Sequence, residues 1–224
     1  LPYETTRPSS SFFFFFDGTR RTYKIGDMVI AGKKIYPVIS AQICAGVSHR
    51  DEKKKIHPTE YFKKSNYLLI SDSMNREDHA ELSKRIERTA LAKSLQLKVL
   101  SYSYDSNSNN NPTDAAVAKA NSLMHDMEVD LLSQLVKSGR LSTREMLIVD
   151  GPLQFLKQDD GSPEYADMFY NVAGVSKSFN PMMPISGKAR RGNQHIGAEL
   201  LKLKRGQRTP VFLKRNSRGR QFGC

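Results

Sequence analysis

Cysteine and long apolar runs are scarce in this chain, and each absence excludes a class of protein. Cys44 and Cys224 are the only cysteines and lie far apart without metal-ligand spacing, so neither a disulfide framework nor a cysteine zinc site is indicated. No stretch reaches the roughly 18 apolar residues of a membrane span. The phenylalanine run at residues 12–16 is too short for a signal peptide and lacks its flanking regions. We therefore expect a soluble, cytoplasmic protein without a membrane partner.

Motifs of several enzyme classes are also missing. Neither the His-Glu-x-x-His pattern of zinc proteases nor the Gly-x-Ser-x-Gly pattern of serine hydrolases occurs. Gly187 and Lys188 resemble the end of a phosphate-binding loop, but Met182 stands where that loop requires glycine. Any nucleotide hydrolysis must therefore come from a partner protein.

Basic residues, in contrast, are abundant and concentrated near one end. The chain carries a formal charge of +12, and residues 187–224 hold eleven basic residues against one acid. Concentrated positive charge attracts polyanions and makes their binding depend on salt. We assign Lys188, Arg190, Arg191 and Arg208 to contacts with nucleic-acid phosphates. Composition alone would equally allow a solvated basic tail with no partner.

Two aspartates, Asp17 and Asp150, each follow an apolar segment and precede a glycine. A buried strand that ends in such a carboxylate presents it at the edge of a sheet. Two such strands side by side would make a site for hard divalent cations, which prefer oxygen ligands. This layout is typical of metal-dependent nucleases.

A third carboxylate, Glu128, lies in a predicted helix that runs from caps at Thr113 and Asp114 to about residue 137. It falls on the apolar stripe of that helix, whereas Asp126 and Asp130 fall on the polar side, where we expect them to be solvated. The stripe contains Val117, Ala120, Met124, Leu131, Leu132 and Leu135. An ionised carboxylate in such a position is costly unless it is paired or binds metal. Glu128 is therefore a candidate metal ligand, unless it lies at the edge of the stripe or pairs with an arginine.

The order of predicted elements indicates an α/β protein with the RNase H-like fold, a mixed sheet with flanking helices. A strand ending at Asp17 precedes a hairpin of residues 20–30 and 34–47. Residues 51–112 form an inserted region with two short strands, an amphipathic helix at 75–95 and a polar loop. The helix with Glu128, the strand ending at Asp150 and a strand at 169–176 follow. We expect one domain over residues 1–224, which is either whole or a fragment truncated at its C-terminus.

Five motifs, taken in order, resemble the NurA family of DNA nucleases. They are Phe16-Asp17-Gly18-Thr19, the helix around Glu128, the Leu147 to Leu153 segment, the Val172 to Ser178 segment and Gly206 to Phe212. The resemblance spans most of the chain. It implies a manganese- or magnesium-dependent deoxyribonuclease with 5′-to-3′ exonuclease and single-strand endonuclease activity in DNA end resection and repair. It also implies a homodimer and a HerA-type hexameric ATPase, a DNA translocase, as partner.

Carried over residue by residue, Asp17, Glu128 and Asp150 match the metal-binding acids of the family. Lys177 matches its lysine, which could hold the scissile phosphate, although spacing alone favours an ordinary exposed lysine. The family also uses an aromatic or histidine residue towards the C-terminus, for which His195 is available without being assigned. The competing hypothesis is a catalytically inactive nucleic-acid-binding or interaction protein on the same fold.

Overall fold

The chain forms two compact units, each described here by itself. The computed structural model describes residues 3–4, 10–30, 34–104, 111–151, 153, 170–176, 196–208, 212–216 and 219–223. Unit 1 comprises Leu1–Phe15 and Arg140–Cys224, and unit 2 comprises Phe16–Gly139. Among the described residues, no helix is both long and apolar enough to cross a membrane.

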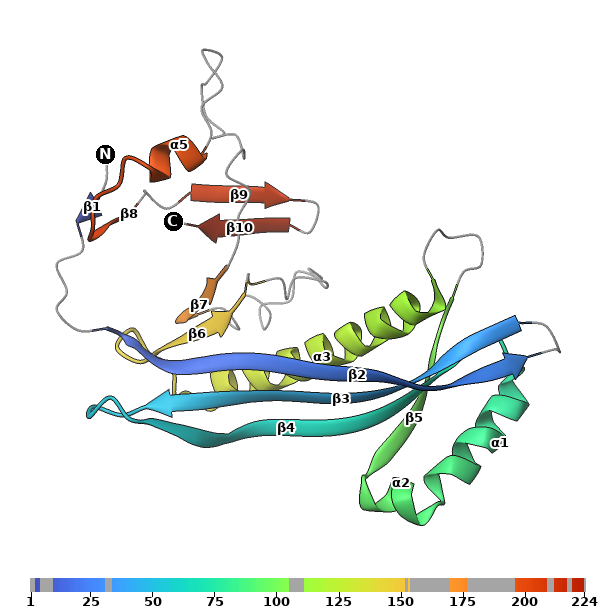
Figure 1. The fold of residues 1–224 in the computed structure, drawn as a ribbon. Helices are drawn as coiled ribbons and strands as arrows, with labels where there is room; N and C mark the ends of the chain where they lie inside the picture. Colours follow the sequence, from blue (N-terminus) through green and yellow to red (C-terminus); the bar gives the residue numbers. More distant parts are fainter. Residues whose placement is uncertain are drawn as a thin grey trace. The chain divides into compact units, whose positions relative to one another are not determined.

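Among the described residues, six strands form a mixed sheet in the order β5-β4-β3-β2-β6-β7 (Figure 1). They are β2 (Phe12–Ile30), β3 (Lys34–Arg50), β4 (Ile56–Ser71), β5 (Leu97–Tyr102), β6 (Met146–Asp150) and β7 (Val172–Val175). β3 and β4 pair antiparallel, whereas β4 pairs with β5, and β6 with β7, in parallel. Helices flank this sheet, which confirms the predicted α/β class with a mixed sheet.

The prediction that a strand ends at Asp17 is wrong, because β2 continues without a break through Asp17 and Gly18 to Ile30. The residues after Gly18 include several that favour strands, such as Thr22, Tyr23 and Val29. The five phenylalanines are also not uniformly buried: Phe14 and Phe16 are buried and the other three are half-buried. This alternation is what a strand with two different faces requires.

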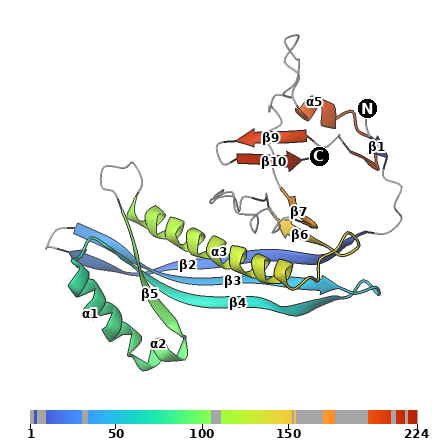
Figure 2. The same ribbon diagram turned by 180° about the vertical axis from the view of Figure 1, so that it is seen from behind.

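The described part of unit 2 carries three helices, on both faces of its part of the sheet (Figures 1 and 2). The longest, α3 (Pro112–Lys137), lies along one face, and α1 (Arg76–Glu87) lies on the other, followed by the short α2 (Ala90–Ser94). The single helix predicted over residues 75–95 is therefore two helices. The break lies at Arg88 and Thr89 because the Thr89 side chain caps the start of α2, accepting a hydrogen bond from the Ala92 N–H.

The ends of α3 differ slightly from those predicted. Asn111, not Thr113 or Asp114, is the N-terminal cap, and its side chain accepts a hydrogen bond of 2.9 Å from the Asp114 N–H. Pro112 at the first helical position fits this start, because a proline there loses no helical hydrogen bond. Gly139 has a φ of 71° and follows the C-terminal end, as predicted for a left-handed stop.

One face of α3 supplies much of the core of unit 2. Its buried residues are Ala116, Ala120, Met127, Leu131, Leu132 and Leu135. Val117 and Met124, expected in the same stripe, are half-buried. Asp130, predicted to be solvated, is exposed but forms an ion pair with Lys63 of β4, which ties the helix to the sheet. The opposite face of the sheet holds a second cluster, in which Leu82 and Ile86 of α1 pack against Leu68 and Val99.

Unit 1 contains β6 and β7 together with several short elements. These are β1 (Tyr3–Glu4), α5 (Ile196–Leu200), β8 (Gln207–Arg208), β9 (Phe212–Asn216) and β10 (Gly219–Gly223). β1 pairs antiparallel with β8, and β9 pairs antiparallel with β10. The Met146 N–H donates a hydrogen bond of 2.7 Å to the Ser11 carbonyl, which aligns the start of β6 with the start of β2.

Candidate functional site

The carboxylate of Glu128 stands directly over Gly18 of β2. A Cβ atom added to Gly18 would lie 1.9 Å from Glu128 Oε1 and 2.9 Å from its Cδ. Real Cβ atoms do not approach other atoms so closely, so a larger residue at position 18 would force the end of the Glu128 side chain to move. Gly18 thus has a packing role within a strand and is not a turn residue. The arrangement brings the carboxylate of Glu128 next to the β2 backbone, one residue from Asp17.

Burial and charge together hold the proton on Glu128. Its side chain is 18% exposed. The pKa of Glu128 is raised from 4.5 to about 7, first by burial and second by the negative charge of Asp17. Carboxyl groups with a strongly shifted pKa are frequent at functional sites, although networks of ion pairs with a purely structural role also shift pKa values. No arginine pairs with Glu128 among the described residues, so the arginine alternative has no support there.

His125 is the ionisable neighbour that the sequence analysis missed. It precedes Glu128 by three residues on α3, and its Nδ1 lies 3.9 Å from Glu128 Oε2. The His125 side chain is 28% exposed, so it is reachable from solvent but still packed against the protein. The signal was present in the sequence as a histidine on the same side of the predicted helix as Glu128.

A second polar contact joins the same two elements. Arg20 of β2 donates a hydrogen bond from Nε to Oδ1 of Asn121 on α3. Gly18 lies under Glu128, and Arg20, two residues later on β2, contacts Asn121, which is earlier on α3 than Glu128. The two elements therefore run antiparallel. Asn121, His125 and Glu128 are spaced by four and three residues, which places them on one stripe of the helix. The polar side chains of Asn121 and His125 therefore lie along the same stripe of α3 as Glu128, and the cationic Arg20 of β2 lies beside this stripe.

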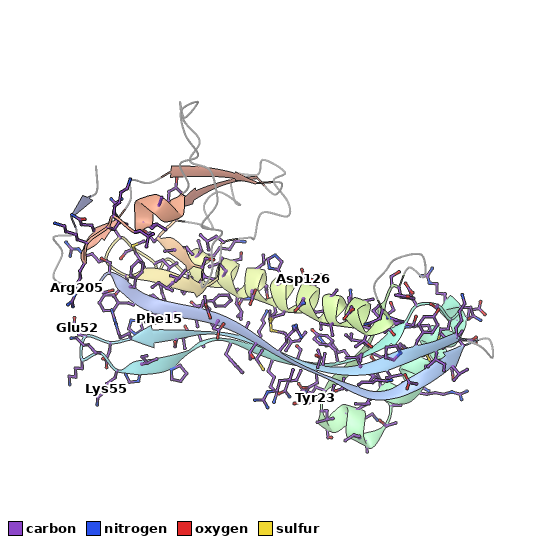
Figure 3. The ribbon with its side chains drawn as sticks, turned by 45° about the horizontal axis from the view of Figure 1, so that its top comes forward. Phe15, Tyr23, Glu52, Lys55, Asp126 and Arg205 are labelled. Atoms are coloured by element: carbon purple, nitrogen blue, oxygen red, sulfur yellow. The ribbon has the colours of Figure 1, made fainter. Side chains whose placement is uncertain are left out.

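Among the described residues, those around Glu128 do not by themselves form a complete metal site. Glu128 offers carboxylate oxygens over Gly18, whereas Asp17 is exposed and, because successive side chains alternate along a strand, points to the opposite face of β2. Within the described residues, no three His, Cys, Asp or Glu side chains lie together as a ready metal cage. Asp126, by contrast, is exposed on α3, as predicted (Figure 3).

Asp150 belongs to unit 1, where it ends β6 as predicted. It is exposed and is paired in register with Val175 of β7. Gly151 follows with a φ of 116°, and its N–H donates a hydrogen bond of 2.8 Å to the Val175 carbonyl. Gly174 of β7 lets this turn pack closely, because a Cβ there would lie 2.7 Å from the Gly151 carbonyl oxygen. The strand-end geometry predicted for Asp150 is therefore present.

Most of the predicted phosphate contacts lie outside the described residues. These are Lys177, Lys188, Arg190 and Arg191, and the unassigned His195 lies outside them as well. Arg208 is described, and it occupies β8 in register with Tyr3 of β1.

Comparison with known proteins adds no relative. Neither a protein-family model nor a curated protein sequence matches this chain. The likeness to NurA nucleases therefore rests on the order of the sequence motifs.

Replacing Gly18 by alanine tests the packing of Glu128. The new Cβ would overlap the carboxylate, so we expect the Gly18→Ala variant to lose about 1–3 kcal/mol of unfolding free energy in urea titrations. Gly26→Ala is the matched control, because Gly26 lies on the same strand and nothing comes within 4 Å of its added Cβ. Equal stabilities of the two variants would show that Glu128 does not occupy the space over Gly18.

Proposed function

We propose that this protein is a divalent-metal-dependent DNA nuclease of the NurA type. The observation that carries the proposal is the Glu128 carboxylate, which is packed over Gly18 and held near the negative charge of Asp17. Bringing two negative carboxyl groups together is costly unless a cation or a proton compensates them. A bound Mn²⁺ or Mg²⁺ would compensate both.

The strand order supports the finer proposal of an RNase H-like fold. Without β5, the order is β4-β3-β2-β6-β7, so the first long strand is central and the later strands extend the sheet on its other side. α3 lies in the chain between these two groups of strands. Asp150 ends β6, is exposed, and matches the third metal-binding acid of the resembled family. We propose that Asp150 joins Asp17 and Glu128 in holding the ion.

Each residue has a distinct part in this proposal. Asp17, Glu128 and Asp150 would hold the metal, and Glu128 must first lose its proton. When bound, the ion supplies an activated water and neutralises the scissile phosphate. Lys177 would hold that phosphate or orient the attacking water. Arg20, fixed by Asn121, is a further cation on the strand that carries Asp17 and could bind a neighbouring phosphate.

The basic C-terminal segment would bring DNA to the acids. We propose phosphate contacts for Lys188, Arg190, Arg191 and Arg208, because residues 187–224 carry most of the positive charge of the chain. Following the family, we further propose action as a 5′-to-3′ exonuclease and single-strand endonuclease in DNA end resection and repair. A homodimer that works in the cytoplasm with a HerA-type translocase belongs to the same proposal.

A cleavage assay on end-labelled single-stranded and duplex DNA tests this function. We expect products with added Mn²⁺ and none with EDTA. DNA binding without cleavage in Mn²⁺ and Mg²⁺ would instead support an inactive nucleic-acid-binding protein. Testing RNA alongside DNA would establish the substrate class.

A further inference from the structure

We propose that the turn between β3 and β4 binds the phosphate groups of a nucleic-acid backbone through Lys53, Lys54 and Lys55. This turn belongs to unit 2 and is separate in the sequence from the basic C-terminal segment. The inference goes beyond the proposed nuclease function, because phosphate binding at the turn requires neither a metal ion nor cleavage. It follows from how the turn is held and from the backbone conformation of one of its lysines.

The turn lies at the free end of a long two-stranded hairpin. β3 and β4 pair antiparallel up to Arg50 and Ile56, and residues 51–55 join them. The hairpin extends past the C-terminal end of α3 in both views of the ribbon (Figures 1 and 2), and Lys55 is labelled at its end in Figure 3. All three lysines of the turn are exposed. Because a two-stranded β-ribbon is narrow enough to enter the major groove of DNA, such an end can approach backbone phosphates closely.

Asp51 fixes the shape of this turn. Its Oδ1 accepts a hydrogen bond of 2.8 Å from the Lys55 N–H, and its Oδ2 lies 3.0 Å from His57 Nε2. The Asp51 carbonyl accepts a bond of 2.9 Å from the Lys54 N–H, and the Asp51 N–H donates one of 2.9 Å to the Lys55 carbonyl. These bonds use the backbones of Lys54 and Lys55, so both ammonium groups remain available to a ligand.

Lys54 occupies a backbone conformation that favours glycine. Its φ is 63°, in the left-handed region, where a residue with a Cβ atom is less stable than glycine. Strained residues of this kind are concentrated at binding sites, where the side chain has a role that offsets the strain. A lysine at this position is therefore expected if its ammonium group binds a ligand.

Charge and polarity favour a nucleic acid over a membrane as the partner. The turn presents three lysines against one fully exposed acid, Glu52, since the Asp51 carboxylate accepts the bonds described above. Binding to a membrane surface depends on buried apolar area as well as on basic charge. Ile56, which follows the turn, is 65% exposed, but a single apolar side chain offers little such area. Contact with a phosphodiester backbone requires only the positive charge.

The experiment measures binding of labelled single-stranded and duplex DNA to the full chain in EDTA at several salt concentrations. The triple variant Lys53→Gln, Lys54→Gln and Lys55→Gln should bind at least about tenfold more weakly at low salt. Its slope of log affinity against log salt concentration should become shallower by about 2. The matched control replaces by glutamine three exposed lysines of α1, α2 and β5, which are Lys84, Lys93 and Lys98. This control loses the same charge and should keep the parent slope.

The single variant Lys54→Gly separates binding from folding. Glycine relieves the left-handed strain, so the urea midpoint of unfolding should rise, while the salt slope should become shallower by about 0.7–0.9. A higher midpoint with an unchanged salt slope would overturn the binding role of Lys54. This variant also keeps the test decisive if the triple variant does not fold.

The outcomes distinguish this inference from the proposed function. Equal salt slopes in the triple variant and its control would overturn the inference, even if the protein cleaves DNA. Weaker binding of the triple variant to phosphatidylserine vesicles, with unchanged DNA binding, would overturn it in favour of a membrane contact. DNA binding that depends on the turn, in a protein that does not cleave DNA with Mn²⁺, would support the inference and overturn the nuclease proposal.

Discussion

Replacing Asp17 or Asp150 by asparagine should reduce manganese-dependent DNA cleavage at least about a thousandfold. A divalent ion typically stabilises the transition state of phosphodiester cleavage by several kcal/mol, and losing about 4 kcal/mol corresponds to that factor. DNA affinity should change little, because we assign phosphate binding to the basic segment. Single-turnover cleavage and binding measured on the same oligonucleotide would check both statements.

The control for this prediction is Asp126→Asn. Asp126 is an exposed carboxylate on α3, two residues from Glu128, and lies on the polar side of the helix (Figure 3). Its loss removes the same charge without removing a proposed ligand, so cleavage should stay close to that of the parent. A rate near the parent value in Asp17→Asn or Asp150→Asn would remove that residue from the metal site.

Replacing Glu128 by glutamine should stabilise the protein at pH 8 in the absence of metal. The pKa of Glu128 is about 7 in the folded protein and 4.5 as its ordinary value, so folding favours the protonated form. The contribution of Glu128 to the free energy of unfolding is at its most favourable below pH 4.5, and it is lost as the pH rises through 7. Above that pH, the ionised group costs up to about 3 kcal/mol, which a neutral glutamine avoids.

Urea unfolding at several pH values checks this prediction. The advantage of Glu128→Gln over the parent should grow between pH 4.5 and pH 8, and saturating Mn²⁺ should stabilise the parent but not the variant. Glu81→Gln is a suitable control, because Glu81 is exposed on α1 and pairs with Arg85, which lowers its pKa. If Glu128→Gln were more stable than the parent by the same amount at every pH, Glu128 would not be protonated near neutral pH.

Local sequence patterns were sufficient to single out Asp150 and Glu128, because the signal for each lies within one strand or one helix. Asp150 was predicted at a strand end because an apolar run precedes it and a glycine follows it, and the structure has β6 ending there. Glu128 was singled out because it interrupts an apolar helical stripe, and its side chain is largely buried. In both cases, the spacing within one element carries the information.

Contacts between distant elements could not be read in the same way. Arg20 and Asn121 are 101 residues apart, and nothing in either segment indicates that they meet. Asp17 and Gly18 looked like the end of a strand because such a pair usually marks a turn. The glycine instead makes room for Glu128, a tertiary requirement that local propensity does not encode.

Calorimetric titration of Mn²⁺ into the parent protein, in buffers of different ionisation enthalpy, tests the central claim most directly. Because the pKa of Glu128 is about 7, ion binding at this carboxylate should displace about 0.9 of its proton at pH 6 and about 0.1 at pH 8. Glu128→Gln should lose this contribution together with most of the affinity. Mn²⁺ binding that is equally tight in Glu128→Gln, with the same proton release, would contradict a metal site built on Glu128.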